Sequence, residues 1–228
     1  MRVIDCPPVS GYLTKQETIA IAGAADLQIR SLLDKQQFHD PLNLASDRGI
    51  SSAMWPLFGL LWPSGLCLAE RLALRSVRPE RVLELGCGLG LASLVGHRLG
   101  ADVTASDCHP LAGIFLAENL RINGLAPMDY QHGQWGAFES LVTGCFDLVI
   151  ASDVLYERDE QGTLAHFIDQ HCADSAEVWV VDPNRANRPA FHRHMQQRGF
   201  DMKEALLHRP SESGLAEYRG RMLTYRRH

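Results

Sequence analysis

The segment from Val82 to Gly90, Val-Leu-Glu-Leu-Gly-Cys-Gly-Leu-Gly, constrains the fold of this chain more than any other. A short apolar stretch with one acid runs into a turn that has glycine at every second position. A buried strand, a glycine-rich turn and a following helix form the first unit of a nucleotide-binding α/β sheet. The glycine spacing is G-x-G-x-G, whereas a dinucleotide turn reads G-x-G-x-x-G. We therefore expect a parallel α/β sheet that binds a ligand other than a dinucleotide.

An acidic residue, Glu84, lies two positions before the first glycine of this turn. A carboxylate at that point repels a phosphate and suits a ligand that carries an ammonium and a sulfonium group. The expected cofactor is therefore S-adenosylmethionine (SAM). The competing hypothesis, an NAD-dependent oxidoreductase, is disfavoured by the glycine spacing.

Strand and helix patterns alternate from residue 81 onward. Strands are predicted over 81–85, 102–106, 130–132, 146–151 and 177–181, with helices over 89–99, 111–122, 161–171 and 189–198. Such alternation implies a mostly parallel sheet with helices on both faces. Two successive strands, 200–208 and 218–226, predict an antiparallel hairpin at the end. This is the α/β, Rossmann-like arrangement of SAM-dependent methyltransferases, with seven strands.

The N-terminal part carries a different pattern. Thr14-Lys15-Gln16-Glu17 matches a capping box, which predicts a helix to about Asp34. A loop-rich connector over 36–56 and a second helix over 65–74 follow. We therefore expect a helical and loop extension over 1–60 that packs on the core, and a SAM-binding domain over 61–228.

Composition narrows the range of partners. The net charge of -5 gives no electrostatic reason to expect nucleic acid. The cluster Arg219, Arg221, Arg226 and Arg227 is interpreted as a solvated edge strand. No stretch reaches the roughly 20 apolar residues of a membrane span, and the six cysteines form no C-x-x-C pair. We expect a cytoplasmic protein with reduced thiols, no metal, and neither a nucleic-acid nor a membrane partner.

Ligands of open parallel sheets bind at the carboxyl ends of the strands. Asp107 follows the second strand and could accept hydrogen bonds from a ribose diol, and Trp135 follows the third and offers a flat surface to a purine. Asp153 and Tyr156 follow the fourth strand. Each has a structural alternative, namely a helix cap for Asp107, core packing for Trp135, and capping and packing of the next helix for the last pair. Their joint occurrence at successive strand ends favours a ligand site.

These motifs resemble the seven-strand lysine methyltransferase family often called methyltransferase family 16. The shared features are Trp62 upstream of the glycine turn, L-E-L-G-x-G-x-G over 83–90, Trp135-Gly136, and the D-x-x-Y motif over 153–156. The resemblance implies a class I SAM-dependent methyltransferase that transfers a methyl group to a lysine side chain of a protein.

The resemblance also assigns roles. Glu84 and the glycine turn hold the methionine part of SAM, Asp107 holds the ribose hydroxyls, and Trp135 lies by the adenine. Asp153 orients the acceptor amine, and Tyr156 lines its channel or accepts a hydrogen bond. The full set expected to bind the cofactor is Trp62, Glu84, Gly86, Cys87, Gly88, Gly90, Asp107, Cys108, Trp135 and Ala151.

Other functions on the same fold stay open. The fourth strand is not followed by N-P-P-Y, which disfavours methylation of amides or adenine. A small-molecule N- or O-methyltransferase acting on an amine remains an alternative to a protein substrate, because fold does not fix function. A silent SAM-binding protein is a further alternative.

Overall fold

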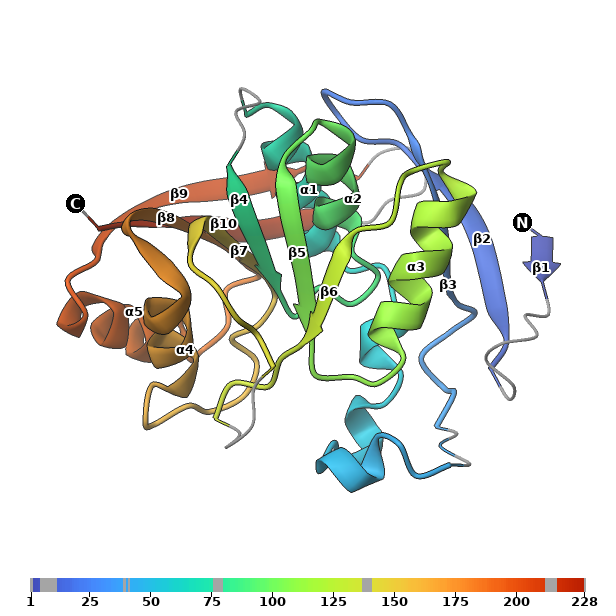
Figure 1. The fold of residues 1–228 in the computed structure, drawn as a ribbon, viewed down its shortest axis with the longest axis horizontal. Coiled ribbons are helices and arrows are strands. Elements are labelled where there is room, and N and C mark those ends of the chain that lie inside the picture. The colour runs from blue at the N-terminus through green and yellow to red at the C-terminus, as the bar shows by residue number, and fades with distance from the viewer. Residues whose placement is uncertain are drawn as a thin grey trace.

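The computed structural model describes residues 2–4, 12–38, 40, 42–75, 80–136, 141–211 and 217–227. Its centre is a seven-stranded sheet with the strand order β6-β5-β4-β7-β8-β10-β9 (Figure 1). Five strands are parallel, and β10 pairs antiparallel with both β8 and β9. The strands are β4 (Arg81–Leu85), β5 (Asp102–Asp107), β6 (Asp129–His132), β7 (Phe146–Ser152), β8 (Cys172–Asp182), β9 (Asp201–Arg209) and β10 (Tyr218–Arg226). The predicted fold class is confirmed.

Helices cover both faces of this sheet. They are α1 (Pro63–Ala73), α2 (Leu91–Arg98), α3 (Ala112–Ile122), α4 (Thr163–His171) and α5 (Arg188–Gln197). Strand β4 shows why two cores form, because successive side chains of a strand point to opposite faces. Val82 packs in the core shared with α1, α2 and α3, whereas Leu83 and Leu85 pack in the core shared with α4 and α5.

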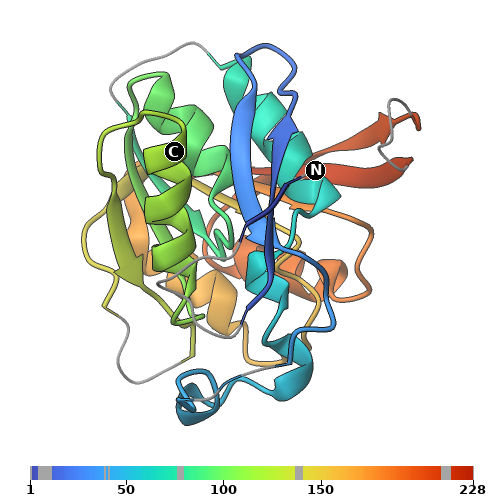
Figure 2. The ribbon, with the colours of Figure 1, turned by 90° about the vertical axis from the view of Figure 1, so that its right-hand side faces the viewer.

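The helix predicted from the capping box is wrong. Residues 12–32 contain the antiparallel strands β2 (Thr14–Ile19) and β3 (Leu27–Leu32), and β1 (Arg2–Ile4) pairs with β2. Leu27 and Ile29 are both fully buried two positions apart, which is the period of a strand. Figure 2 shows β2 and β3 lying outside the helices of the main sheet.

Two asparagines of α3 fix strand β3 in place. The backbone N–H of Gln28 donates to Oδ1 of Asn123 at 2.9 Å, and that of Arg30 donates to Oδ1 of Asn119 at 2.8 Å. These donors are two residues apart, so they leave β3 on the same side. Tertiary contacts with α3 therefore override the local helix signal.

The arginine-rich strand β10 is not an edge strand, contrary to the sequence interpretation. It lies between β8 and β9, and β9 forms the edge of the sheet. The arginines of β10 and the adjacent Arg227 each form an ion pair with an acid, although Arg219 and Arg226 remain exposed to solvent. The pairs are Arg219 with Glu217, Arg221 with Glu204, Arg226 with Glu177 and Arg227 with Asp169.

One segment, Ser52–Ala73, has the length and mean hydropathy of a membrane span. The structure divides it into two 3-10 helices, η2 (Ser52–Met54) and η3 (Leu57–Gly59), and helix α1. Leu66, Leu68 and Leu72 of α1 are buried in the core against α2 and the sheet. The apolar character of this segment thus serves internal packing.

Candidate functional site

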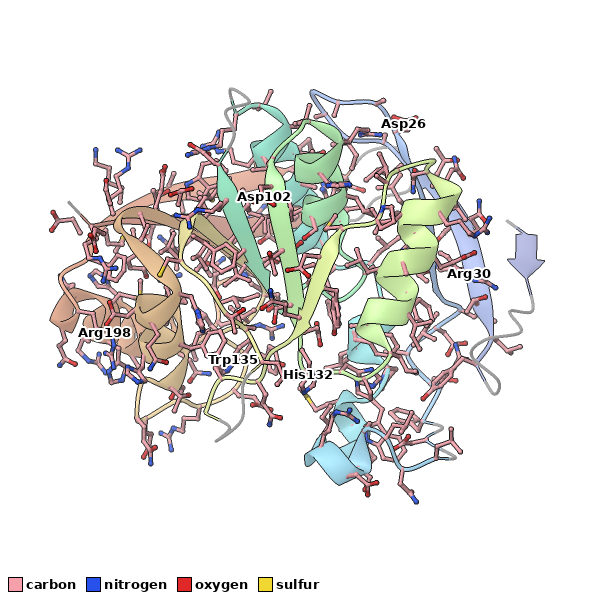
Figure 3. All side chains as sticks on the ribbon, in the orientation of Figure 1. Asp26, Arg30, Asp102, His132, Trp135 and Arg198 are labelled. Atoms are coloured by element: carbon pink, nitrogen blue, oxygen red, sulfur yellow. The ribbon has the colours of Figure 1, made fainter. Side chains whose placement is uncertain are left out.

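A cavity of about 300 Å³ opens at the carboxyl ends of β4, β5 and β7. The strand order reverses between β4 and β7, which is where open α/β sheets bind ligands. In Figure 3, Asp102 marks the start of β5, and His132 and Trp135 lie at the opposite edge, where β6 ends. Ten of the twelve predicted site residues line this cavity: Trp62, Glu84, Gly86, Cys87, Gly88, Asp107, Cys108, Trp135, Asp153 and Tyr156.

Gly90 and Ala151 do not line the cavity, so the structure does not support their expected contact with the cofactor. Gly90 precedes α2 with φ 73°, and a side chain there would collide with Leu116 of α3. Ala151 is buried inside β7, paired with Leu85 of β4. Both residues shape the sheet and the first helix around the site.

The glycine turn is tight for two reasons. Gly86 and Gly88 have φ values of 62° and 53°, a left-handed region that favours glycine. A Cβ atom on Gly88 would lie 2.8 Å from the carbonyl oxygen of Phe58. The η3 segment therefore leaves no room for a side chain at Gly88, which also lines the cavity.

Glu84 is a buried acid on the cavity wall. Its side chain is 3% exposed, and Oε2 accepts hydrogen bonds from the backbone N–H of Ser93 at 2.8 Å and from the Ser93 hydroxyl. Burial raises the pKa of Glu84 to about 7, because desolvation disfavours the charged form. A ligand cation beside this carboxylate would offset that cost.

Asp107 accepts one backbone hydrogen bond from the glycine turn and one from the loop that follows β5. Oδ2 accepts the N–H of Gly88 and Oδ1 accepts the N–H of His109, each at 2.8 Å. Burial raises the pKa of Asp107, and these two bonds oppose that rise. The helix cap that the sequence left open is not formed, because the N-cap residue of α3 is Leu111, and Asp107 instead closes a local turn with His109. Each carboxylate oxygen still has a second lone pair for a hydroxyl donor.

The wall formed by residues before α1 was not foreseen from the sequence. Segments η2 and η3 place Met54, Leu57 and Phe58 on the cavity. Phe58 stacks on the imidazole of His109 with ring centroids 3.8 Å apart and an interplanar angle of 11°. Closely spaced aromatic residues before Trp62 were the available signal.

His109 presents a buried donor to the same cavity. Its Nδ1 accepts the N–H of Leu111 at 3.2 Å, so the neutral ring carries its proton on Nε2. Nε2 has no hydrogen-bond partner among the described residues. Burial lowers the pKa of His109 to about 4, which keeps the ring neutral at physiological pH.

The two predicted tryptophans lie on different walls. Trp135 follows β6, and its ring comes within 3.7 Å of the Cβ position of Gly86. Trp62 precedes α1 and donates its indole N–H to the carbonyl oxygen of Leu57 at 2.8 Å. One indole is thus near the glycine turn, and the other is fixed to the N-terminal wall.

Asp153 follows β7 in a constrained conformation. Its φ of 54° is left-handed, and its N–H donates to the carbonyl oxygen of Val181 at 2.9 Å. Arg185 donates from Nε to Oδ1 at 2.7 Å and from Nη2 to Oδ2 at 2.9 Å. Arg185 was missed in the sequence, although it follows β8 and the rule of strand ends applies to that strand as well.

The segment after β8 holds the D-x-x-Y segment through a second side chain. Asn187 donates from Nδ2 to the carbonyl oxygens of Leu155 at 3.0 Å and Glu157 at 2.8 Å. The backbone N–H of Arg185 donates to Oδ2 of Asp182 at 2.9 Å. Two neighbouring strand ends therefore form one rigid corner of the cavity. The described residues contain no group of three or more His, Cys, Asp or Glu placed to hold a metal ion.

A model of the family described as lysine methyltransferase matches residues 42–198, more than half of the chain. The chain belongs to this lysine methyltransferase family. The match includes the N-terminal wall, the glycine turn and the D-x-x-Y segment, and it ends at the close of α5. The family indicated by the sequence motifs is confirmed.

Individual relatives agree with this placement. The chain is 31% identical over 151 residues to the electron transfer flavoprotein beta subunit lysine methyltransferase of Xenopus laevis, covering 62% of this chain. It spans 58% of that relative's length. It is also 28% identical over 183 residues to protein N-lysine methyltransferase METTL21A of Mus musculus, covering 74% of this chain and 83% of the relative.

A solved structure shows the same fold at lower identity. The methyltransferase from Pyrococcus furiosus has a TM-score of 0.59 and 16% identity, covering 81% of this chain and 98% of that protein. At this identity the likeness concerns the fold alone.

Proposed function

We propose that this chain is a SAM-dependent methyltransferase that transfers a methyl group to a lysine side chain of a protein. One observation carries the proposal, namely that three acidic side chains line a single cavity at the ends of neighbouring strands. Glu84 and Asp107 lie at the ends of β4 and β5, and Asp153 lies at the end of β7. Such a cavity suits two cationic partners that meet inside it. Membership of the lysine methyltransferase family supports the same conclusion.

The residues present fit SAM. Glu84 is a buried carboxylate that gains from a ligand ammonium, and Asp107 has lone pairs for ribose hydroxyls. Trp135 offers its ring for an adenine, with Cys108 on the same cavity wall. When bound, SAM supplies an activated methyl group, which forms an N–C bond with the amine as the S–C bond breaks and leaves its electron pair on sulfur.

The chain's own residues position the acceptor. A lysine side chain has a pKa near 10.4, so it must lose a proton before it can act as a nucleophile. The Asp153 carboxylate attracts and orients this amine, and Tyr156 lies beside it at the partly exposed mouth of the cavity. Correct orientation of two reactants can supply roughly 7–11 kcal/mol of the barrier reduction.

The acceptor is identified by transfer of label. The purified chain is incubated with SAM labelled in its methyl group and with lysate from cells that lack the enzyme. Mass spectrometry then locates the label. Purified electron transfer flavoprotein beta subunit is the first single acceptor to test, because it is named for the Xenopus relative. We expect label on a protein lysine. Label in a metabolite would instead indicate a small-molecule methyltransferase.

The variant Asp153→Asn tests the role assigned to the acceptor side. It should lose at least 100-fold in methyl transfer and keep its affinity for SAM within about threefold, because Asp153 bonds to Val181 and Arg185 rather than to Glu84 or the glycine turn. Calorimetric titration with SAM measures the second quantity. Full methylation by this variant would contradict the assignment, and parallel loss of SAM binding would indicate collapse of the cavity.

A further inference from the structure

The pairing of Asp153 with Arg185 has a chemical consequence for the acceptor amine. Both residues line the cavity, and the two-point contact leaves the Asp153 side chain 11% exposed and the Arg185 side chain 40% exposed. A guanidinium stays charged at all physiological pH values. The carboxylate that is expected to meet the substrate is therefore already matched by a permanent cation.

A bare carboxylate in this place would oppose the reaction. It would attract the lysine ammonium, and it would also raise the pKa of that ammonium and retain its proton. Methyl transfer needs the neutral amine, so a strong unbalanced charge on Asp153 would aid binding and hinder chemistry. A carboxylate paired with Arg185 keeps lone pairs that can accept an N–H, because a bidentate contact uses two of about four sites.

We propose that Arg185 is a positioning residue that neutralises Asp153, so that the acceptor lysine docks on the carboxylate by hydrogen bonding and still gives up its proton to solvent before methyl transfer. This inference rests on the proposed function. It assigns to Arg185 an effect on proton loss rather than a contact with SAM.

The other charged and titratable groups around Asp153 cannot replace Arg185. Asp182 at the end of β8 adds negative charge, and Tyr156 on the same loop and Tyr218 on β10 are neutral at physiological pH. Glu84 and Asp107 are further acids that line the cavity. All of these groups either favour the ammonium form of a lysine or leave it unchanged.

The position of Arg185 is set by the fold. Its backbone N–H is held by Asp182, and Asn187 two residues later ties the same segment to the carbonyl oxygens of Leu155 and Glu157.

Arg188, which begins α5, pairs instead with Glu204 of β9. The guanidinium of Arg185 is thus preorganised on Asp153 rather than drawn there by chance.

The test uses the pH dependence of single-turnover methyl transfer at saturating SAM. The acceptor is the purified protein labelled in the experiment above, with electron transfer flavoprotein beta subunit tried first. In Arg185→Gln, the acidic limb of the rate profile should move up by about one pH unit, which lowers the rate near pH 7 about tenfold. KM for the acceptor should stay the same or fall. Arg185→Lys should show a smaller shift than Arg185→Gln, because lysine keeps the positive charge and loses the two-point contact of the guanidinium.

The matched control is Arg219→Gln, which also removes one arginine charge. Arg219 pairs with Glu217 at the surface and does not line the cavity. Its profile should coincide with that of the unchanged protein. Thermal unfolding and SAM titration establish that each variant is folded. If Arg185→Gln proves unfolded, the neutral variant Arg185→Met is measured in its place, and an unshifted profile there overturns the inference.

Two further results would overturn it. A lower rate of Arg185→Gln with an unmoved pH profile would mean that Arg185 has a purely structural role. A higher KM with an unchanged rate would mean that it binds the acceptor directly. Failure of the proposed function is seen separately, because the unchanged protein would then label no protein lysine at any pH.

Discussion

Replacing Glu84 with glutamine should stabilise the protein above pH 7 and at the same time remove its affinity for SAM. Glu84 is 3% exposed, and its carboxylate receives hydrogen bonds from Ser93 alone among the described residues. Burial raises its pKa from the ordinary value of 4.5 to about 7. Glutamine has nearly the same shape, and its amide oxygen can accept the same hydrogen bonds without a charge.

The size and sign of the effect follow from linkage. The folded protein binds the Glu84 proton more tightly than the unfolded chain does, so stability falls as the pH rises from about 4.5 to 7. At about 1.36 kcal/mol per pKa unit, the full loss is about 3 kcal/mol, of which about 2 kcal/mol falls between pH 5.5 and 8. Glu84→Gln lacks this loss, so the difference in free energy of unfolding between the variant and the unchanged protein should grow across that interval.

Urea unfolding without cofactor, at pH 5.5, 6.5, 7.5 and 8, measures the free energy of unfolding of both proteins. Other titrating groups largely cancel in the difference. Asp107 does not cancel fully, but loss of the neighbouring negative charge lowers the Asp107 pKa and acts in the same direction. A difference that stays constant over the four pH values would refute the assigned pKa of Glu84.

The same variant tests the ligand side. A hydrogen bond to a charged group contributes about 1.5–3 kcal/mol, so Glu84→Gln should bind SAM about 10- to 100-fold more weakly. Calorimetric titration at pH 8 measures this affinity. A more stable protein with unchanged SAM affinity would place the ligand ammonium elsewhere in the cavity.

Further predictions concern the turn and the N-terminal sheet. Gly88→Ala should lower the free energy of unfolding by about 2–3 kcal/mol, because a Cβ there has φ 53° and approaches the Phe58 carbonyl to 2.8 Å. Gly124→Ala, with φ 64° and open space around its Cβ, should cost about 1 kcal/mol, and equal losses in urea unfolding would contradict the close-approach argument. Asn119→Ala should cost about 1–3 kcal/mol by leaving the buried N–H of Arg30 unpaired, and an unchanged urea midpoint would show that β3 is held by other contacts.

The sheet could be predicted because its signals are local and repeated. The predicted bounds of two strands, Arg81–Leu85 and Tyr218–Arg226, are the ones that the structure shows. Strand patterns and the glycines that end helices are signals in the local sequence. Strand β8 starts five residues earlier than expected, at Cys172. Residues 173–176, Ala-Asp-Ser-Ala, lie at an irregularity of β8 between Cys172, which pairs with Phe146, and Glu177, which pairs with Leu148, and they have no apolar pattern that reveals a strand.

The N-terminal sheet could not be predicted from the same rules. The capping-box pattern of Thr14 to Glu17 is a local signal, and strand β3 is stabilised by side chains nearly 90 positions away. The apolar residues Leu27 and Ile29 are spaced as in a strand. The residue between them, Gln28, is also common in helices, so this short pattern does not distinguish the two. Pairing with β2 and the hydrogen bonds to Asn119 and Asn123 of α3 give the strand its partners.

Site residues were predictable as types and positions rather than as partners. The rule of strand ends brought Glu84, Asp107 and Asp153 to one cavity. It did not show that Asp107 already binds two backbone N–H groups or that Asp153 already binds Arg185. Such partners depend on which loops face one another, and a strand-end rule specifies the edge of the sheet without specifying the contacts made there.

The carboxylates of Glu84 and Asp107 lower the stability of the fold when they are ionised, and the same charge favours binding of a cationic ligand. The acids Glu84 and Asp107 both have pKa values raised by burial, so each weakens the folded state when it is ionised. Asp153 differs from these two acids because Arg185 supplies a counter-charge to it within the fold. The cofactor side thus leaves its charge to be matched by the ligand, whereas the acceptor side matches its own. That asymmetry suits a cation that must stay charged on one side and an amine that must become neutral on the other.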